Sequence, residues 1–114
     1  MMFRKDEGFT LVELMVVVLI IGILVAIAIP VFNSARATAQ LRSCFANQRT
    51  LEGGAQAWAA DDVNNDIQAV TTADLDPLFV KDAATITCPT TAAVYAFTAA
   101  SGGTIADCAT HGHF

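Results

Sequence analysis

A chain of 114 residues has room for one small domain and an appendage, and 54% of its residues are hydrophobic. The formal net charge is −5, and from Asp61 onward seven aspartates face a single lysine, Lys81. Such an acidic region offers no basic surface to phosphate backbones, so we expect no specific nucleic-acid binding. The sequence also has no phosphate-binding loop. Its candidate catalytic bases are limited to two histidines near the end, and we find no nucleophile–base arrangement elsewhere. We therefore expect neither an enzyme nor a cofactor.

The N-terminal part begins with a short charged leader, residues 1–8, and continues as an apolar run over residues 9–32. As a helix rising about 1.5 Å per residue, this run nearly matches a membrane hydrocarbon core of about 30 Å. Arg4 and Lys5 favour a cytoplasmic N-terminus. We predict a single-pass helix in the cytoplasmic membrane, with the rest of the chain outside.

Glu13 is the one carboxylate inside the apolar run. Hydrocarbon penalises a carboxylate by several kcal/mol unless it is neutralised or paired, so Glu13 is expected to have a cationic partner. Gly22 and Pro30 are soft points of the helix, because glycine lowers helix propensity and proline removes a backbone donor.

Residues 33–60 are predicted to continue the helix in amphipathic form. One mostly apolar face recurs at spacings of three and four, and we expect it to pack on a small sheet. The face comprises Ala37, Leu41, Cys44, Gln48, Leu51, Ala55 and Trp58. Gly53 and Gly54 are expected to weaken the helix near its end.

Residues 61–114 are predicted to form a loop region and a small antiparallel sheet. Polar residues 61–66 indicate a loop, and three short runs favour strands at 85–88, 93–98 and 104–108. Ser101-Gly102-Gly103 would join the last two runs as a hairpin turn. The predicted fold class is α+β: a long N-terminal hydrophobic helix continuing into a small domain with a short antiparallel sheet.

The cysteines allow two interpretations. Cys88 and Cys108 flank the predicted hairpin, and a disulfide between them would stabilise a thin domain by about 3 kcal/mol in the chain-entropy model. The alternative is a metal site formed by Cys88, Cys108, His111 and His113. Cys44 is interpreted as a buried small hydrophobe, with pairing to either of the other cysteines left open.

The stretch Gly8-Phe9-Thr10-Leu11-Val12-Glu13-Leu14, followed by the apolar run and Pro30, resembles the class III signal of type IV pilins. The same signal occurs in pseudopilins of type II secretion and DNA-uptake machines. The resemblance covers about residues 1–45. The segment 88–112 resembles the C-terminal hairpin of small pilins and major pseudopilins more loosely, which implies the pilin fold.

This resemblance implies a processing and assembly sequence. A prepilin peptidase would cut between Gly8 and Phe9 and N-methylate the new terminus. The new ammonium of Phe9 would pair with Glu13 of another subunit, since opposite charges at low dielectric offset much of each other's desolvation cost. The implied partners are further copies in a helical filament, an assembly ATPase and its platform membrane protein. The chain would move from the cytoplasmic membrane to a cell-surface filament.

Several alternatives remain open at this stage. A pseudopilin of a secretion or competence machine would have the same N-terminal signal, apolar helix and ion pair. A minor, tip-located adhesin-type subunit would act as a binding module. An ordinary secretory signal could be cleaved after Ala26-Ile27-Ala28, but Glu13 interrupts the start of its apolar region and Pro30 lies close behind. A plain membrane anchor gives no reason for Glu13.

Overall fold

The computed structural model describes residues 8–100 and 103–114, and the chain divides into two compact units after Arg36. A single helix, α1 (Leu11–Asp61), begins in the first unit and ends in the second. Of the predicted leader, only Gly8 lies among the described residues. The long N-terminal helix is thus confirmed, with its first helical residue at Leu11 instead of Phe9.

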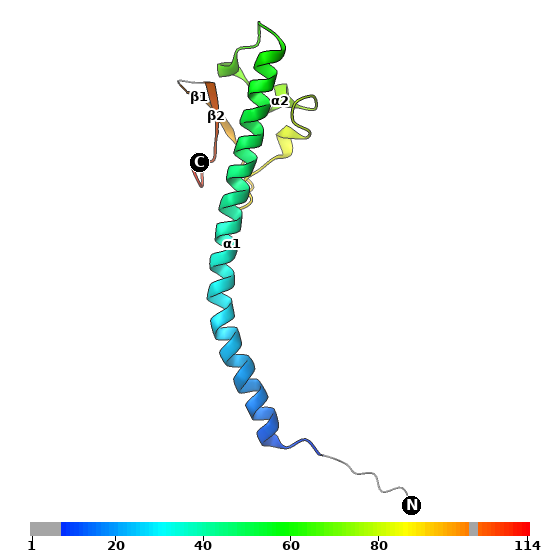
Figure 1. Cartoon of the computed structure of the whole chain (residues 1–114), viewed down its shortest axis with the longest axis vertical. Coiled ribbons are helices and arrows are strands. Elements are labelled where there is room, and N and C mark those ends of the chain that lie inside the picture. The colour runs from blue at the N-terminus through cyan, green and yellow to red at the C-terminus, as the bar shows by residue number, and fades with distance from the viewer. Residues whose placement is uncertain (1–7, 101–102) are drawn as a thin grey trace, which may run out of the picture. The chain divides into compact units, whose positions relative to one another are not determined.

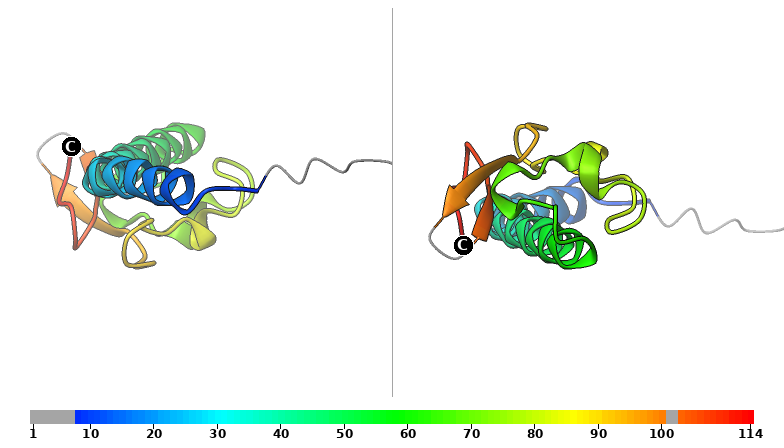
Figure 2. Two further views of the ribbon diagram at one scale, coloured as in Figure 1. Left: turned by 90° about the horizontal axis from the view of Figure 1, so that it is seen from below. Right: turned by 90° about the horizontal axis from the view of Figure 1, so that it is seen from above.

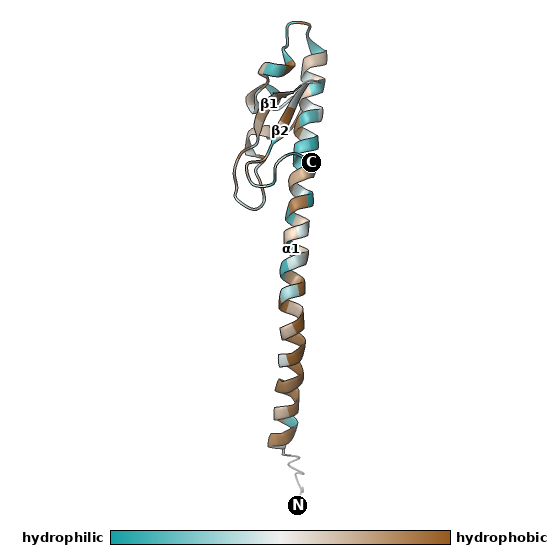
Figure 3. Ribbon diagram, turned by 90° about the vertical axis from the view of Figure 1, so that its left-hand side faces the viewer, coloured by the Kyte–Doolittle hydropathy of each residue, from teal (hydrophilic) through white to brown (hydrophobic). Residues whose placement is uncertain are grey.

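The two ends of α1 are set by short polar side chains. At the N-terminal end, the Thr10 hydroxyl accepts a hydrogen bond from the Glu13 backbone N–H. At the other end, the Asp62 carboxylate accepts hydrogen bonds from the backbone and side chain of Asn64, which favours a turn over further helix. Between these ends, the sequence changes from almost uniformly hydrophobic to mixed, as Figure 3 shows.

After α1 the chain forms short elements and a hairpin (Figure 1). Two 3₁₀ turns, Ile67–Ala69 and Ala83–Thr85, flank the short helix α2 (Thr72–Leu75). Strands β1 (Ala96–Ala100) and β2 (Gly103–Asp107) then pair antiparallel, with Phe97 opposite Ala106. The α+β class with a short antiparallel sheet is confirmed. The predicted turn at 101–103 falls mostly on residues 101–102, which lie outside the described residues.

The sheet is smaller than the sequence indicated. The predicted strand at 85–88 is wrong, because this stretch contributes only an isolated bridge between Thr87 and Val94. The Cys88 backbone N–H donates a hydrogen bond to the Ala93 carbonyl at 2.8 Å. Residues 88–93 therefore form a tight turn, and the predicted strand at 85–88 does not extend the sheet.

The core lies in the second unit, where the hairpin packs beside the later part of α1 (Figure 2). From α1 the fully buried side chains include Cys44, Gln48, Leu51 and Ala55, which confirms the centre of the predicted face, whereas Ala37 at its start is exposed. The opposing core residues come from α2, the second 3₁₀ turn, the loops and the hairpin: Val70, Leu75, Val80, Ala83, Cys88, Tyr95, Ala106 and Cys108.

Gly54 and Gly53 differ in their surroundings. Gly54 is buried, and a Cβ built there would collide with Cγ2 of Val80, so glycine lets the loop carrying Val80 approach the helix closely. A Cβ at Gly53 would meet no atom within 4 Å. Of these two glycines, Gly54 is the one that packing requires.

Candidate functional site

The first half of α1 exposes its apolar side chains all round. Among the large apolar residues from 11 to 32, exposure ranges from 46% at Val25 to 72% at Leu11. Fully burying a valine, leucine or isoleucine stabilises by about 1.5–3 kcal/mol each, so leaving this surface in water would cost tens of kcal/mol. By length and composition the helix can cross a membrane. This segment therefore requires lipid or other apolar helices around it.

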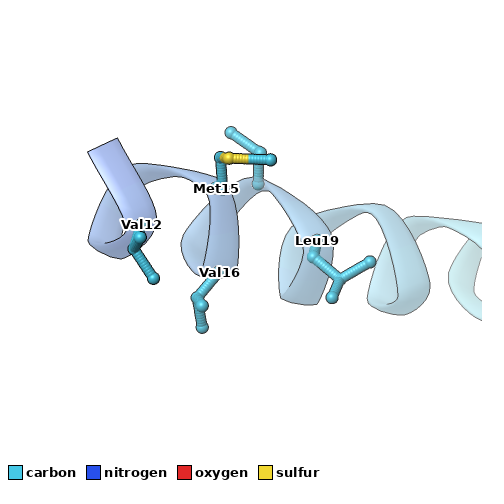
Figure 4. A pocket seen from close by; sticks show the side chains of 5 residues that line it. Val12, Met15, Val16 and Leu19 are labelled. Carbon is cyan, nitrogen blue, oxygen red and sulfur yellow. The ribbon is translucent and has the colours of Figure 1, made fainter. Parts of the chain in front are cut away.

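A shallow apolar depression lies near the start of α1 (Figure 4). It is lined by Val12, Met15, Val16, Val18 and Leu19. These side chains follow helical spacing and leave grooves between them, into which ridges of another helix can pack. The depression is thus suited to an apolar helix and has no polar group to orient a small ligand.

Glu13 has a local partner at the helix start. Its Oε2 accepts a hydrogen bond from the Thr10 backbone N–H at 2.8 Å and another from the Thr10 hydroxyl at 2.9 Å. With the bond from Glu13 N–H to the Thr10 hydroxyl at 3.2 Å, this is a complete capping box. The carboxylate is held beside the segment Gly8–Thr10, where the sequence analysis places the cleavage site.

The other residues predicted to act in this segment lie before or within α1. Gly8 and Phe9 precede the helix and are exposed. Pro30 lies inside α1, and a side chain at Gly22 would meet no atom within 4 Å. Processing at Gly8–Phe9 and loss of helix between Gly22 and Pro30 in a filament stay predictions.

A second group of chemically reactive side chains lies in the second unit. Cys44, Cys88, Cys108 and His111 each offer one ligand atom, and all four atoms lie within 4.8 Å of one another. His111 Nδ1 is 3.6 Å from Cys88 Sγ and 3.7 Å from Cys108 Sγ. All three cysteines are buried free thiols in this structure. The Cys88–Cys108 disulfide stays a prediction.

The thiols of this group have different environments. Burial raises the pKa of Cys44 to about 11. Burial alone would also raise the pKa of Cys88, but hydrogen bonds from the backbone N–H groups of Thr90 and Thr91 outweigh it and lower that pKa to about 6. Cys88 is therefore the thiol whose surroundings stabilise negative charge.

His113 lies apart from this group. Its Nε2 is 2.6 Å from Glu52 Oε1, which also accepts the Ala106 backbone N–H at 2.9 Å. Of the four residues considered for a metal site from sequence, three come together, and Cys44 takes the fourth place in the cluster.

Two functional residues were missed by sequence reasoning. Thr10 was not recognised as a cap, although Thr-x-x-Glu before an apolar run is the sequence signature of a capping box. Cys44 was interpreted as a buried small hydrophobe, with pairing to Cys88 or Cys108 left open, and was not included among the possible metal ligands. Its position on the helix face that packs against the hairpin, which carries the other cysteines, was the available signal.

These features define a class of protein: a chain whose exposed apolar helix needs an apolar environment, with a capped acidic residue at the start of that helix and a small α+β unit at its end. The family described as the prokaryotic N-terminal methylation motif matches residues 3–29. This match adds an N-terminal methylation motif to these features.

Curated relatives are similar over the N-terminal part. The fimbrial protein EcpB of Eikenella corrodens is 54% identical over 41 residues, which cover 36% of this chain and 26% of that protein. A fimbrial protein of Moraxella nonliquefaciens is 54% identical over 42 residues (37% and 27%). A fimbrial protein of Pseudomonas aeruginosa is 43% identical over 53 residues (46% and 34%). No solved structure matches this chain.

The chain thus spans between about a quarter and a third of the length of the curated relatives it matches. It carries the N-terminal methylation motif of prokaryotic pilins, and the resemblance to type IV pilins is confirmed for this segment.

Proposed function

We propose that this chain is a structural subunit of a type IV pilus-like filament, polymerised through α1. The observation that carries the proposal is the methylation motif at residues 3–29, set at the start of a helix whose apolar surface is exposed all round. A soluble monomer would not tolerate that surface, whereas a bilayer and then a bundle of like helices would cover it in turn.

Processing comes first in the proposed sequence of events. A prepilin peptidase removes residues 1–8 and methylates the new amino group on Phe9. Before this step the chain is a single-pass protein of the cytoplasmic membrane, with its N-terminus inside because of Arg4 and Lys5. The acidic second unit lies on the outer side.

Assembly follows from the charge created by cleavage. The ammonium of Phe9 in one subunit pairs with the Glu13 carboxylate of a neighbour and sets the axial register of apolar helices. The capping box supports this role, because Thr10 holds the carboxylate at the helix start, on the same turn as the processed end. An assembly ATPase acting through a platform membrane protein supplies the extraction from the bilayer.

The proposed role is structural and not enzymatic. The relatives are named as fimbrial proteins, which favours a surface filament over a secretion or competence pseudopilus. In the described part of the second unit, the Phe114 ring packs against Phe45 and His113 and lies beneath the Arg49 guanidinium. This aromatic and basic group is small beside the exposed apolar surface of α1, which favours the structural role over a tip-located adhesin-type role.

The test is the composition of surface filaments. Filaments sheared from cells that make this chain should contain it as the main subunit, by electron microscopy with an antibody to the second unit. Full processing of the chain with no surface filament would contradict the pilus assignment and favour the pseudopilus.

A further inference from the structure

We propose that Cys44, Cys88, Cys108 and His111 form a tetrahedral zinc site that fastens the second unit. Nothing in the proposed filament role requires this site, and the two proposals stand or fall separately. Three thiolates and one imidazole are a ligand set typical of structural zinc, and four protein ligands leave no open position for catalysis.

The distances fit a metal centre. Zinc bonds of about 2.3 Å to sulfur and 2.0–2.1 Å to nitrogen at tetrahedral angles place the sulfur and nitrogen atoms about 3.6 Å apart. Nδ1 of His111 lies 3.6 Å from Cys88 Sγ and 3.7 Å from Cys108 Sγ. All four ligand atoms lie within 4.8 Å, so small side-chain adjustments bring them onto one ion.

The imidazole is oriented as a ligand. Nδ1 faces two sulfurs at almost equal distances, and one nitrogen has only one hydrogen or one lone pair to offer them. A shared cation satisfies both contacts at once. The other nitrogen, Nε2, lies 3.4 Å from the Thr90 hydroxyl, the type of outer contact that fixes the tautomer of a metal-bound histidine.

The backbone around the ligands forms two matching turns. The Ala92 N–H donates to the Cys88 carbonyl at 2.8 Å, and the Gly112 N–H donates to the Cys108 carbonyl at 2.7 Å. Each turn closes on a residue with positive φ, 55° at Ala92 and 70° at Gly112. A non-glycine residue in this conformation is uncommon, so the first turn is held by its surroundings.

Further hydrogen bonds connect these turns to each other and to α1. The Thr91 and Thr110 hydroxyls, one from each turn, lie 3.1 Å apart. The buried side chain of Gln48 donates from α1 to the Gly112 carbonyl. The turn that carries Cys108 and His111 is thereby bonded to α1 one helical turn from Cys44.

The site would join segments far apart in sequence. Cys44 comes from α1, Cys88 from the turn after the 3₁₀ segment, and Cys108 with His111 from the turn after β2. A unit of this size buries a thin core and needs a staple. A Cys88–Cys108 disulfide is the competing staple, but it would leave Cys44 and His111 beside it without a shared partner.

The first test is metal content. The full chain, purified in detergent under anaerobic, reducing conditions, should contain one zinc per chain by elemental mass spectrometry. Replacement by Co²⁺ should give the visible bands of a tetrahedral ion with thiolate charge transfer. Absence of metal from a folded chain, stoichiometric iron or copper, or a Cys88–Cys108 disulfide in protein isolated without reductant would overturn the proposal.

Variants then assign the ligands. Cys44→Ser should weaken zinc binding by more than about 100-fold, and Thr90→Val, which loses only the outer hydroxyl, by about 10–100-fold. His113→Ala is the matched control and should bind zinc like the original chain. If Cys44→Ser leaves zinc affinity unchanged, the four-ligand site is wrong.

His111→Cys keeps the test informative even if other variants fail to fold. It supplies a fourth thiolate, so zinc should be retained and the charge-transfer bands of the Co²⁺ form should strengthen. An unchanged Co²⁺ spectrum would exclude His111 as a ligand.

Discussion

The Thr10 hydroxyl lies 2.9 Å from Glu13 Oε2 at the start of α1. Glu13, the carboxylate inside the apolar segment, thus forms a capping box with Thr10: its side chain accepts the Thr10 backbone N–H, and its own N–H donates to the Thr10 hydroxyl. In the proposed filament it has a second role, as the partner of the Phe9 ammonium. These two roles use different properties of Glu13, hydrogen-bond acceptance and negative charge, and can therefore be separated.

Glu13→Gln should separate capping from charge. Glutamine can still accept the Thr10 hydrogen bonds but cannot pair with an ammonium. We expect the variant to be processed normally and to lose filament yield as severely as Glu13→Ala, measured by quantitative immunoblot of sheared filaments.

Thr10→Ala is the control, since it removes the hydroxyl and leaves the charge. It should lose about 0.5–2 kcal/mol of helix stability and keep most of the filament yield. Wild-type yield from Glu13→Gln would show that the carboxylate acts only as a cap.

Substitutions at the two adjacent glycines should act in opposite directions. Gly54→Ala places a methyl group against Cγ2 of Val80 and should destabilise the second unit by about 1–3 kcal/mol. Gly53→Ala meets no atom within 4 Å and should stabilise the exposed helix position by about 0.5–1 kcal/mol. Denaturant unfolding, followed by fluorescence of the single tryptophan, Trp58, measures both; equal effects would contradict the packing assigned to Gly54.

Glu52 should act as a fastening between α1 and β2. Its Oε1 accepts a hydrogen bond from the Ala106 N–H and lies beside His113 Nε2. Glu52→Ala therefore leaves the Ala106 N–H without its acceptor. We expect a loss of about 1–3 kcal/mol in the free energy of unfolding. Glu52→Gln keeps an acceptor and should lose less; a larger loss with glutamine than with alanine would exclude this role.

Metal removal should loosen the second unit selectively. When the free zinc concentration is 100 times the dissociation constant, zinc binding stabilises the folded form by about 2.7 kcal/mol. A strong chelator should therefore lower the unfolding midpoint reported by Trp58, and added zinc should restore it. A midpoint unaffected by chelation in reduced protein would show that the core alone holds this unit.

Local patterns predicted much of this fold. The apolar run, the Gly8–Glu13 motif and the three-and-four spacing from Leu41 to Trp58 each depend on neighbours in sequence, and the structure confirms the helix and its buried centre. The hairpin of β1 and β2 also follows from local strand propensity.

The misses involve contacts between distant segments. The predicted strand at 85–88 lacks a continuous partner and forms a turn instead. Gly54 indicates a weak helix position by propensity, whereas its role depends on Val80 far along the chain. Likewise Cys44 lies beside Cys88, Cys108 and His111 because the hairpin packs on α1. Its position on the predicted helix face indicated that it faces the hairpin, but not which residues it meets there.

The central claim is that cleavage before Phe9 creates the charge that Glu13 pairs with, and the N-terminus of the mature chain tests it most directly. Intact-mass and N-terminal peptide mass spectrometry of the chain from its producing cells should show N-methylated Phe9 as the first residue. A chain that retains residues 1–8, or one that begins at Ile29 after cleavage as a secretory signal, would contradict the account.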